Sequence, residues 1–413
     1  MQVVSVSRFP TKIFYGWWVV AGAFAVMFMG FGAAYTFGSF FHSLHDEFGA
    51  TRREVSLVFS LTAFLYFSLG ALSGPFADRI GPRRVIAVGG VLVGAGLLFA
   101  AMTQRLWQVY FTYSLGIGLG IGIIYVPSVS AVQHWFVQQR GFASGLAVAG
   151  IGLGTLMMPP IATQLVSAFG WRWAYVVLGM AALAIMIPAA LLIEQDPTAR
   201  GLTPDGGPPS ADGSAASVSG ATLREALQSA TFWWLYFALV MTSLGLFIPF
   251  VHLVPYATDH GISAFTASLI LGMIGAGSTV GRLALGSMAD RLGRRQSLIG
   301  AFLLMACMLV WWLMFTSVWA LLIFAVLFGI GYGGVVALVP ALTTDYFGVR
   351  QTGAIIGFLY TAASIGSLLG PTLAGVAFDL HHHYTLPILL SAGANLIAVA
   401  CLVILGKTAK KSY

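Results

Sequence analysis

Charge is scarce in this chain: only 8% of its 413 residues are charged, 58% are hydrophobic, and the mean hydropathy is +0.89. Soluble domains contain about 25% charged residues, so this composition cannot cover a surface that faces water. A soluble enzyme, a nucleic-acid-binding domain and a disordered scaffold are therefore excluded. Cysteine is limited to Cys307 and Cys401, both in apolar runs, which excludes a disulfide framework and metal-ligand spacing. The only asparagine, Asn395, is followed by Leu-Ile and is no glycosylation acceptor.

Long apolar runs dominate what is present. A helix needs about 20 mostly apolar residues to cross a bilayer, and charged and turn residues divide the chain into twelve such runs. We therefore expect an all-α polytopic membrane protein. The first run, with about 27 apolar residues and no small-residue cleavage site, is too long for a signal peptide. The expected spans are 15–41, 53–76, 84–103, 108–133, 141–168, 171–193, 232–257, 264–288, 296–315, 318–343, 352–378 and 385–405.

Basic residues are unevenly distributed between the two sides of these spans. With the amino terminus inside, 15 of the 20 Lys and Arg residues fall in cytoplasmic segments, four fall outside, and Arg282 lies within a span. Basic residues favour the cytoplasmic side, so we expect both termini in the cytoplasm and the protein in the plasma membrane, or the inner membrane of a bacterium. The net charge of +7 then reflects topology and not a nucleic-acid partner.

One long polar stretch separates six spans from the other six. Residues 194–221 are rich in Gly, Pro, Ser and Asp, a composition typical of a flexible linker. Thr222 and Glu225 predict a capping box that begins a short amphipathic helix. The expected domains are an N-terminal six-helix bundle (1–193), a cytoplasmic linker with this helix (194–230) and a pseudo-symmetric C-terminal six-helix bundle (231–413).

The two halves repeat each other. GPFADRIGPRR (74–84) follows the second span, and GSMADRLGRR (286–295) follows the eighth span 212 residues later. Gly116 and Pro127 of the fourth span recur as Gly329 and Pro340 of the tenth, at an offset of 213. Secondary transporters are built from such repeats, with the substrate site between the halves near the bilayer midplane.

The repeated loops also suggest a gate. Asp78 with Arg79, and Asp290 with Arg291, lie at cytoplasmic helix ends, where an Asp can pair with an Arg or a helix N-terminus across the seam. Contacts of this kind would hold the inner side shut in one state. An ordinary positive-inside loop is the alternative interpretation for either copy alone.

On these motifs the chain resembles the major facilitator superfamily over its full length. It is more narrowly similar to the monocarboxylate transporter branch and the related bacterial oxalate:formate antiporters. The residues that carry this resemblance are Tyr15-Gly16-Trp17, Tyr125 with Pro127, Trp135-Phe136, residues 140–150 and the stretch around Arg282. The resemblance implies a carrier of small monocarboxylates such as lactate or pyruvate, working by alternating access. Symport with a proton, a functional monomer and no cofactor are expected.

Arg282 is the main candidate for the substrate site. It lies about 12 Å of helix rise before Asp290, near the middle of a core about 30 Å thick. A central Arg costs at least about 2.5–3.5 kcal/mol unless paired or hydrated, and none of the thirteen acids lies mid-span. A substrate carboxylate is the expected partner, because a guanidinium binds it bidentately. Hydrogen bonds to main-chain carbonyls or tyrosine hydroxyls are the alternative.

The resemblance supports the same assignment, since the branch places a substrate-binding arginine at this position. Two departures affect the chemistry. Animal monocarboxylate carriers have an aspartate, implicated in proton coupling, where this chain has Ser278. Ser278 is therefore included among the candidate substrate-binding residues. The antiporters have a second cation, a lysine, where this chain has Tyr360. One buried positive charge favours a substrate with one negative charge.

Tyrosines and a histidine complete the candidates. Tyr35, Tyr125, Tyr332 and Tyr360 lie away from the span ends, where a hydroxyl needs a partner; they would bind the carboxylate or an alkyl group, or else join helices. His252, near the outer end of the seventh span, could relay protons or be a satisfied polar residue of the outer vestibule. The run His381–His383 is better explained as a solvated loop than as a metal site.

Other functions stay open. An exchanger of organic anions would need a substrate on the opposite side. A drug exporter would require a mid-span acid. A membrane enzyme would convert its substrate chemically, and a receptor-like sensor would bind ligand without flux.

Overall fold

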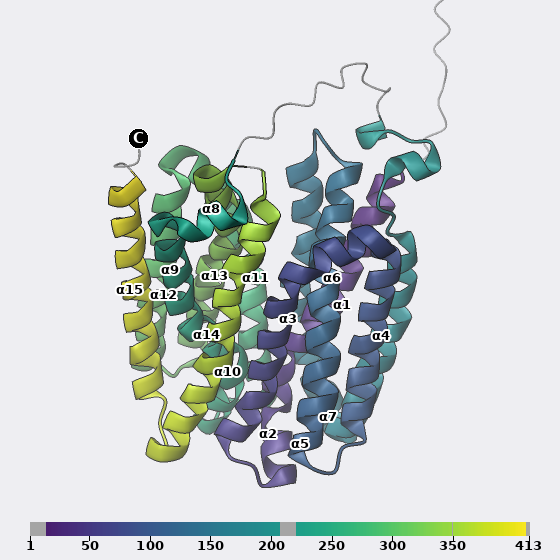
Figure 1. The fold of residues 1–413 in the computed structure, drawn as a ribbon. Coiled ribbons are helices and arrows are strands. Elements are labelled where there is room, and N and C mark those ends of the chain that lie inside the picture. The colour runs from purple at the N-terminus through teal and green to yellow at the C-terminus, as the bar shows by residue number, and fades with distance from the viewer. Residues whose placement is uncertain (1–13, 207–219, 349, 410–413) are drawn as a thin grey trace, which may run out of the picture.

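Helices make up nearly all of the computed structural model, which describes residues 14–206, 220–348 and 350–409 (Figure 1). No β-strand occurs in these ranges. The long helices are α1 (Gly16–Tyr35), α2 (Phe37–Phe48), α3 (Arg52–Ile80), α4 (Pro82–Ala101), α6 (Leu115–Trp135), α7 (Arg140–Leu192), α9 (Ala230–Leu246), α10 (Ile248–Asp259), α11 (Ala264–Leu292), α12 (Arg294–Met314), α13 (Val318–Phe347), α14 (Thr352–His381) and α15 (Thr385–Ala409). The short helices are α5 (Leu106–Val109), which continues through a π-helical turn (Tyr110–Ser114) into α6, and α8 (Leu223–Gln228).

These helices form twelve crossings, as the sequence predicts. Two crossings are divided, α1–α2 at Thr36 and α9–α10 at Phe247. α7 contains two crossings, because Gly170 (φ +81°, ψ 162°) interrupts its helical backbone. Ten segments of the described chain are long and apolar enough to span a membrane when α7 is counted once. The remaining crossing is α3, a 29-residue helix that packs between α6 and α14.

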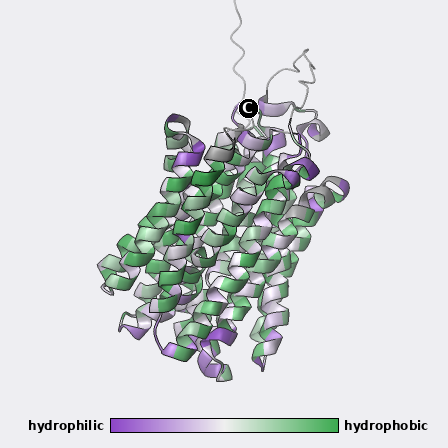
Figure 2. Ribbon diagram, turned by 60° about the vertical axis from the view of Figure 1, so that its left-hand side comes forward, coloured by the Kyte–Doolittle hydropathy of each residue, from purple (hydrophilic) through white to green (hydrophobic). Residues whose placement is uncertain are grey.

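Hydropathy varies along the length of the helices (Figure 2). Apolar residues fill the middle of the bundles, and hydrophilic residues gather at both ends. α8 and the end of α15 lie at one end, which we call the linker face (Figure 1). The opposite end, which includes α2 and α5, is the far face. The molecule is an integral membrane protein, and the linker face is the side predicted to be cytoplasmic.

The crossings gather into two bundles. α7 packs against α1 and α4 in the first bundle, and α13 packs against α11 and α12 in the second. Between the bundles, α3 lies against α14, α7 against α11, and α2 against α10. The predicted domain boundaries remain a proposal, although the linker does connect the two bundles (Figure 1).

The sequence repeat is also a repeat of backbone conformation. α3 ends at Gly81 with φ 92° and ψ 137°, and α11 ends at Gly293 with φ 90° and ψ 140°. A positive φ of this size is strained for any residue with a Cβ. Both copies of the motif therefore need glycine at this position to turn the chain into the next helix.

The described ends of the linker are held against the bundles. Glu194 accepts hydrogen bonds from Arg83 and Arg200, and Asp205 accepts from the main-chain N–H groups of Val137 and Gln138. Arg200, with a smaller contribution from Arg83, lowers the pKa of the Glu194 carboxyl below its usual value.

At the other end of the linker, the predicted capping box of Thr222 and Glu225 is confirmed. Ala221 donates a main-chain hydrogen bond to Phe347. The flexible linker predicted for 194–221 therefore includes fixed segments, and its middle, 207–219, lies outside the described residues.

Close helix contacts depend on glycine, and Gly277 provides a test. A Cβ at Gly277 of α11 would lie 2.2 Å from the Val326 carbonyl oxygen of α13. Gly277→Leu should therefore destabilise the protein by about 1–3 kcal/mol through overpacking, measured as a lowered Tm in detergent. Gly300→Leu, at an exposed position with no atom within 4 Å, is the matched control. Equal Tm values for the two variants would contradict this account of the seam.

Candidate functional site

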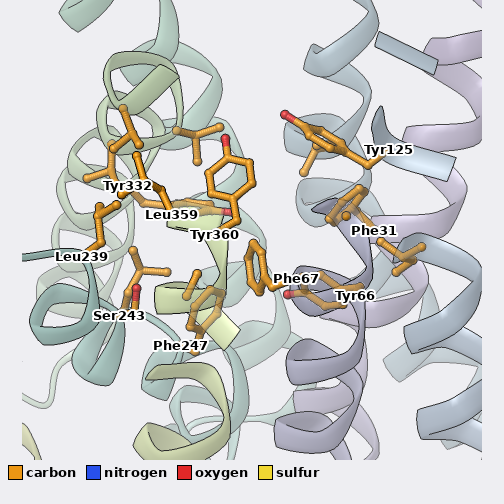
Figure 3. A pocket seen from close by; sticks show the side chains of 18 of the residues that line it. Phe31, Tyr66, Phe67, Tyr125, Leu239, Ser243, Phe247, Tyr332, Leu359 and Tyr360 are labelled. Carbon is orange, nitrogen blue, oxygen red and sulfur yellow. The ribbon is translucent and has the colours of Figure 1, made fainter. Parts of the chain in front are cut away.

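A pocket lies between the two bundles (Figure 3). Its empty space is about 890 Å³, including the part open to solvent. Nine lining residues come from the first bundle and twelve from the second. Seven of them carry a polar side-chain group: Tyr35, Tyr66, Tyr125, Ser243, Arg282, Tyr332 and Tyr360.

Arg282 provides the only charged side chain among the described residues that line this pocket. Its Nη1 donates to the Val148 carbonyl oxygen of α7 at 2.8 Å, so the bond joins the two bundles. The Nε and Nη2 atoms are buried and have no hydrogen-bond partner. Together these two nitrogens form one edge of the guanidinium, the geometry that binds a carboxylate bidentately.

The sequence-based alternative for Arg282 is thus partly realised, since one of its nitrogens does bond a main-chain carbonyl. That bond leaves two buried donors unsatisfied. An unpaired buried donor costs about 1–3 kcal/mol, and more when it carries charge. These two unsatisfied donors therefore favour the binding of an anion in the pocket.

All four predicted tyrosines line the pocket together with Arg282. Tyr35 and Tyr332 are hydrogen-bonded through their hydroxyls at 3.1 Å, which connects α1 of one bundle to α13 of the other. Tyr35 also stacks on Phe250 of α10, with ring centroids 4.5 Å apart. These buried contacts close the pocket on its far side. Tyr125 and Tyr360 are half-buried, and both are close enough to Arg282 for its charge to act on their hydroxyls.

A row of aromatic rings follows the pocket wall from one bundle to the other (Figure 3). Successive ring centroids are 5.9, 5.8, 4.5 and 6.3 Å apart. We call this row the aromatic belt; its members, in order, are Tyr125, Phe31, Tyr66, Phe67 and Tyr360. Both ends of the belt are therefore tyrosines whose hydroxyls are influenced by the charge of Arg282.

Sequence reasoning missed part of this wall. Tyr66 points its hydroxyl into the pocket (Figure 3), and Ser243 lines the opposite bundle's side. Tyr66 could have been identified as a further tyrosine away from the span ends. Nothing in the sequence distinguished Ser243 or Phe67 from the many other serines and phenylalanines of the spans.

Ser278 and His252 are placed elsewhere. Ser278 is buried outside the described pocket lining, with its carbonyl oxygen against Gly333 of α13. His252 is fully buried near the far face. Its Nε2 lies 2.9 Å from the Pro371 carbonyl oxygen and 3.2 Å from the Ser56 hydroxyl, and its Nδ1 lies 3.1 Å from the Tyr384 hydroxyl.

His252 belongs to a polar network that joins the bundles at the far face. Arg52 at the start of α3 forms a 2.7 Å ion pair with Asp259 of α10 and donates to the Tyr384 hydroxyl at 2.6 Å. Asp379 of α14 accepts the main-chain N–H groups of Arg52 and Arg53, each at 3.0 Å. We call this network the far-face cluster; it consists of Arg52, Ser56, His252, Asp259, Pro371, Asp379 and Tyr384.

The far-face cluster was also missed, because its acids and Arg52 look like ordinary loop charges in the sequence. Asp379 occupies the N-terminus of α3, where a carboxylate is favoured by the free N–H groups and the helix dipole. The carboxylate comes from the other bundle, so this interaction exists only while the far face is closed.

The bundles are also in close contact at the far face. A Cβ on Gly375 of α14 would meet the Arg53 main chain of α3 at 2.8 Å. Close packing therefore holds the far face together in addition to the far-face cluster.

The predicted gate residues lie at the linker face. Arg79 and Arg291 are exposed at the ends of α3 and α11. The side chains of Asp78 and Asp290 lie outside the part of the chain that the structure describes. Among the described residues, no group of three His, Cys, Asp or Glu side chains could hold a metal ion.

Comparison with known proteins identifies a family model. The model of the Major Facilitator Superfamily matches residues 22–286 and 233–412. The human monocarboxylate transporter 11 is 29% identical over 393 residues, covering 91% of this chain and 80% of that protein. The MFS-type transporter pytF of Aspergillus terreus is 30% identical over 287 residues, covering 69% of this chain and 93% of that protein.

A solved structure agrees with the fold. A bacterial homolog of the human lysosomal transporter Spinster, in an inward-facing and occupied conformation, aligns with a TM-score of 0.71. The alignment covers 97% of this chain and 98% of that chain at 14% identity, a likeness of fold alone. These relatives are transporters rather than enzymes.

Proposed function

The chain belongs to the Major Facilitator Superfamily, and on that basis we propose that it carries organic monocarboxylates across the membrane by alternating access. Lactate- and pyruvate-like acids are the first candidates in this class, and a proton is the proposed co-substrate. The plasma membrane is the proposed location, with the linker face in the cytoplasm. Transport of small molecules is what membership of the family establishes, and the rest is our proposal.

The unpartnered edge of Arg282 carries this proposal. It provides two buried donors in a pocket between the bundles, and no described lining residue is an acid. A carboxylate would satisfy both donors and neutralise the charge. A second negative charge would have no cationic partner in the described lining, which favours one carboxylate over two. The human monocarboxylate transporter similarity supports the same substrate class.

The tyrosines have proposed roles around this anion. Tyr125 and Tyr360 would donate hydrogen bonds to the carboxylate or to a neighbouring hydroxyl. Tyr35 and Tyr332 would separate when the pocket opens toward the far face, because their hydrogen bond joins opposite bundles. Ser278 is a weaker candidate than the sequence suggested, since it lies outside the described lining.

Gating is proposed to alternate between the two faces. The far-face cluster holds the present state closed on one side. The Asp78–Arg79 and Asp290–Arg291 motifs would close the linker face when the bundles rock. Alternating access requires that these two sets of contacts are not made together.

Uptake of radiolabelled L-lactate into proteoliposomes tests the coupling. An inward proton gradient should drive accumulation several-fold above equilibrium, and collapse of the gradient with an ionophore should abolish it. Protein-free vesicles provide the control for passive entry of the neutral acid. An exchanger is the second candidate, favoured by the lack of an acidic proton carrier in the described lining. It would take up lactate only into preloaded vesicles and would ignore the gradient.

Substitution of Arg282 tests the site. Arg282→Ala should lower uptake at least about tenfold, because each hydrogen bond to a charged group contributes about 1.5–3 kcal/mol. Arg282→Lys should also lose most activity, since a point charge cannot form the two-pronged contact. Tm in detergent would establish that both variants fold. Uptake at the wild-type rate in Arg282→Ala would rule out the assignment.

A further inference from the structure

The pocket wall is more apolar than a lactate-sized anion requires. Twenty-one residues from both bundles line it. Fourteen of the twenty-one lining residues have no polar side-chain group. The methyl group of a lactate bound at Arg282 would leave most of this wall in contact with water.

The aromatic belt gives the apolar wall a direction. It begins and ends at Tyr125 and Tyr360, on whose hydroxyls the charge of Arg282 acts, and it passes through Phe31 and Phe67. Phe67 also contacts Phe247 of the second bundle, with ring centroids 5.4 Å apart. A ligand whose carboxylate binds Arg282 would therefore place its remaining atoms along aromatic faces from both bundles.

We infer that the preferred substrates are monocarboxylates that carry a bulky apolar or aromatic group, such as 2-hydroxy acids with a phenyl or branched alkyl side chain. This inference rests on the proposed monocarboxylate function and specifies its substrate class. The carboxylate supplies the negatively charged partner that Arg282 lacks in the described lining. The apolar group displaces water from the belt, and aromatic rings offer it edge-to-face contacts.

A homologous series of 2-hydroxy acids separates the two contributions. Each buried methylene improves affinity by about fourfold, so the KM for uptake should fall from lactate to 2-hydroxy-4-methylpentanoate and again to 3-phenyllactate. The KM for 3-phenyllactate should be at least about tenfold below that for lactate. The amide of 3-phenyllactate, which keeps the ring and lacks the charge, should compete poorly.

Variants of the belt make the test specific. Phe67→Ala should raise the KM for 3-phenyllactate several-fold more than it raises the KM for lactate. Phe99→Ala, which removes an exposed ring on α4, is the matched control and should change neither value. Tm in detergent would verify that both variants are folded.

The outcomes distinguish failure of this inference from failure of the proposed function. If lactate is carried with a KM equal to or below that of 3-phenyllactate, the bulky-substrate inference is wrong and monocarboxylate transport stands. If no acid of the series is carried or binds, and the amide behaves as the acids do, the proposed function itself fails.

The far-face cluster carries a second, independent inference. Main-chain carbonyls only accept, so the bond to Pro371 places the hydrogen of the neutral His252 imidazole on Nε2. A guanidinium only donates, so the Tyr384 oxygen accepts from Arg52, and its hydroxyl hydrogen is directed to Nδ1 of His252. When His252 is neutral, every polar atom in this chain of hydrogen bonds therefore has a partner.

Protonation of His252 would break this arrangement. The added hydrogen on Nδ1 would face the Tyr384 oxygen, whose own hydrogen would lose its acceptor. Arg52 bonds the same hydroxyl, so two cations would share one partner in a buried site. The titratable and charged groups surrounding the imidazole are Arg52, Tyr384, Asp259, Asp379, Tyr256 and, on α2, His42.

We propose that His252 is an acid sensor of the far-face gate, whose protonation favours opening of that side. Opening would hydrate the imidazolium and separate it from Arg52. The closed far face accommodates His252 well only in its neutral form. By linkage, acid therefore shifts the population toward the open state. This holds whatever substrate the pocket takes.

Distances between spin labels test this gate. Labels on Gln104→Cys and Thr316→Cys, in far-face loops of opposite bundles, with Cys307 and Cys401 replaced by Ala, would be measured in nanodiscs. Lowering the pH from 7.5 to 5.5 should increase the long-distance population several-fold. His252→Gln, which keeps a donor and an acceptor but cannot titrate, should remove this response.

A matched histidine controls for general effects of acid. His134→Gln, at an exposed position near the linker end of α6, should retain the response. If His252→Gln still opens in acid, protonation of Asp259 or Asp379 is responsible and the sensor assignment is wrong. No change of distance with pH in the wild-type protein would also overturn it.

Discussion

A buried guanidinium with two of its three nitrogens lacking a hydrogen-bond partner is the feature around which this molecule is arranged. In a membrane interior a charge without a partner is costly, and Arg282 is only partly compensated by the Val148 carbonyl of the opposite bundle. That bond also places the guanidinium between the bundles. The unsatisfied edge, the surrounding tyrosines and the apolar wall then define one kind of ligand, an anion with an apolar body.

The contacts that join the bundles at the far face enclose the site on that side. An ion pair and a helix N-terminus capped by Asp379 hold the far face together. An anion in the pocket is thus shielded from the far side by the Tyr35–Tyr332 bridge and the polar network above it.

Membership of a family with many substrates leaves the cargo to the chemistry of the pocket. Relatives named as monocarboxylate transporters and relatives named only as MFS-type transporters are about equally similar to this chain. The single cation limits the charge of the substrate, and the aromatic belt extends the space available to it. Coupling is a separate matter: the described pocket lining contains no acid, and the one buried histidine at the seam lies in the far-face cluster.

The sequence by itself determined the membrane architecture and the exceptional residue. In lipid, an apolar run of about 20 residues can satisfy its backbone hydrogen bonds only as a helix. The twelve crossings, the break at 194–221 and the repeat of Gly81 at Gly293 could therefore all be predicted. Arg282 was identifiable because a charge among apolar residues is an exception that composition reveals. The predicted tyrosines converge on it, with Ser278 and His252 placed apart.

Only the tertiary structure decided which side chains meet. Tyr35 and Tyr332 are 297 residues apart, and Arg52 meets Asp259, Asp379 and Tyr384 only because α3 lies against the second bundle. Tyr66, Ser243 and Phe67 lie on helix faces that have no local periodicity to distinguish them, since in lipid every face of a spanning helix can be apolar. Contacts between such faces depend on how the two bundles pack, and that is a property of the whole chain.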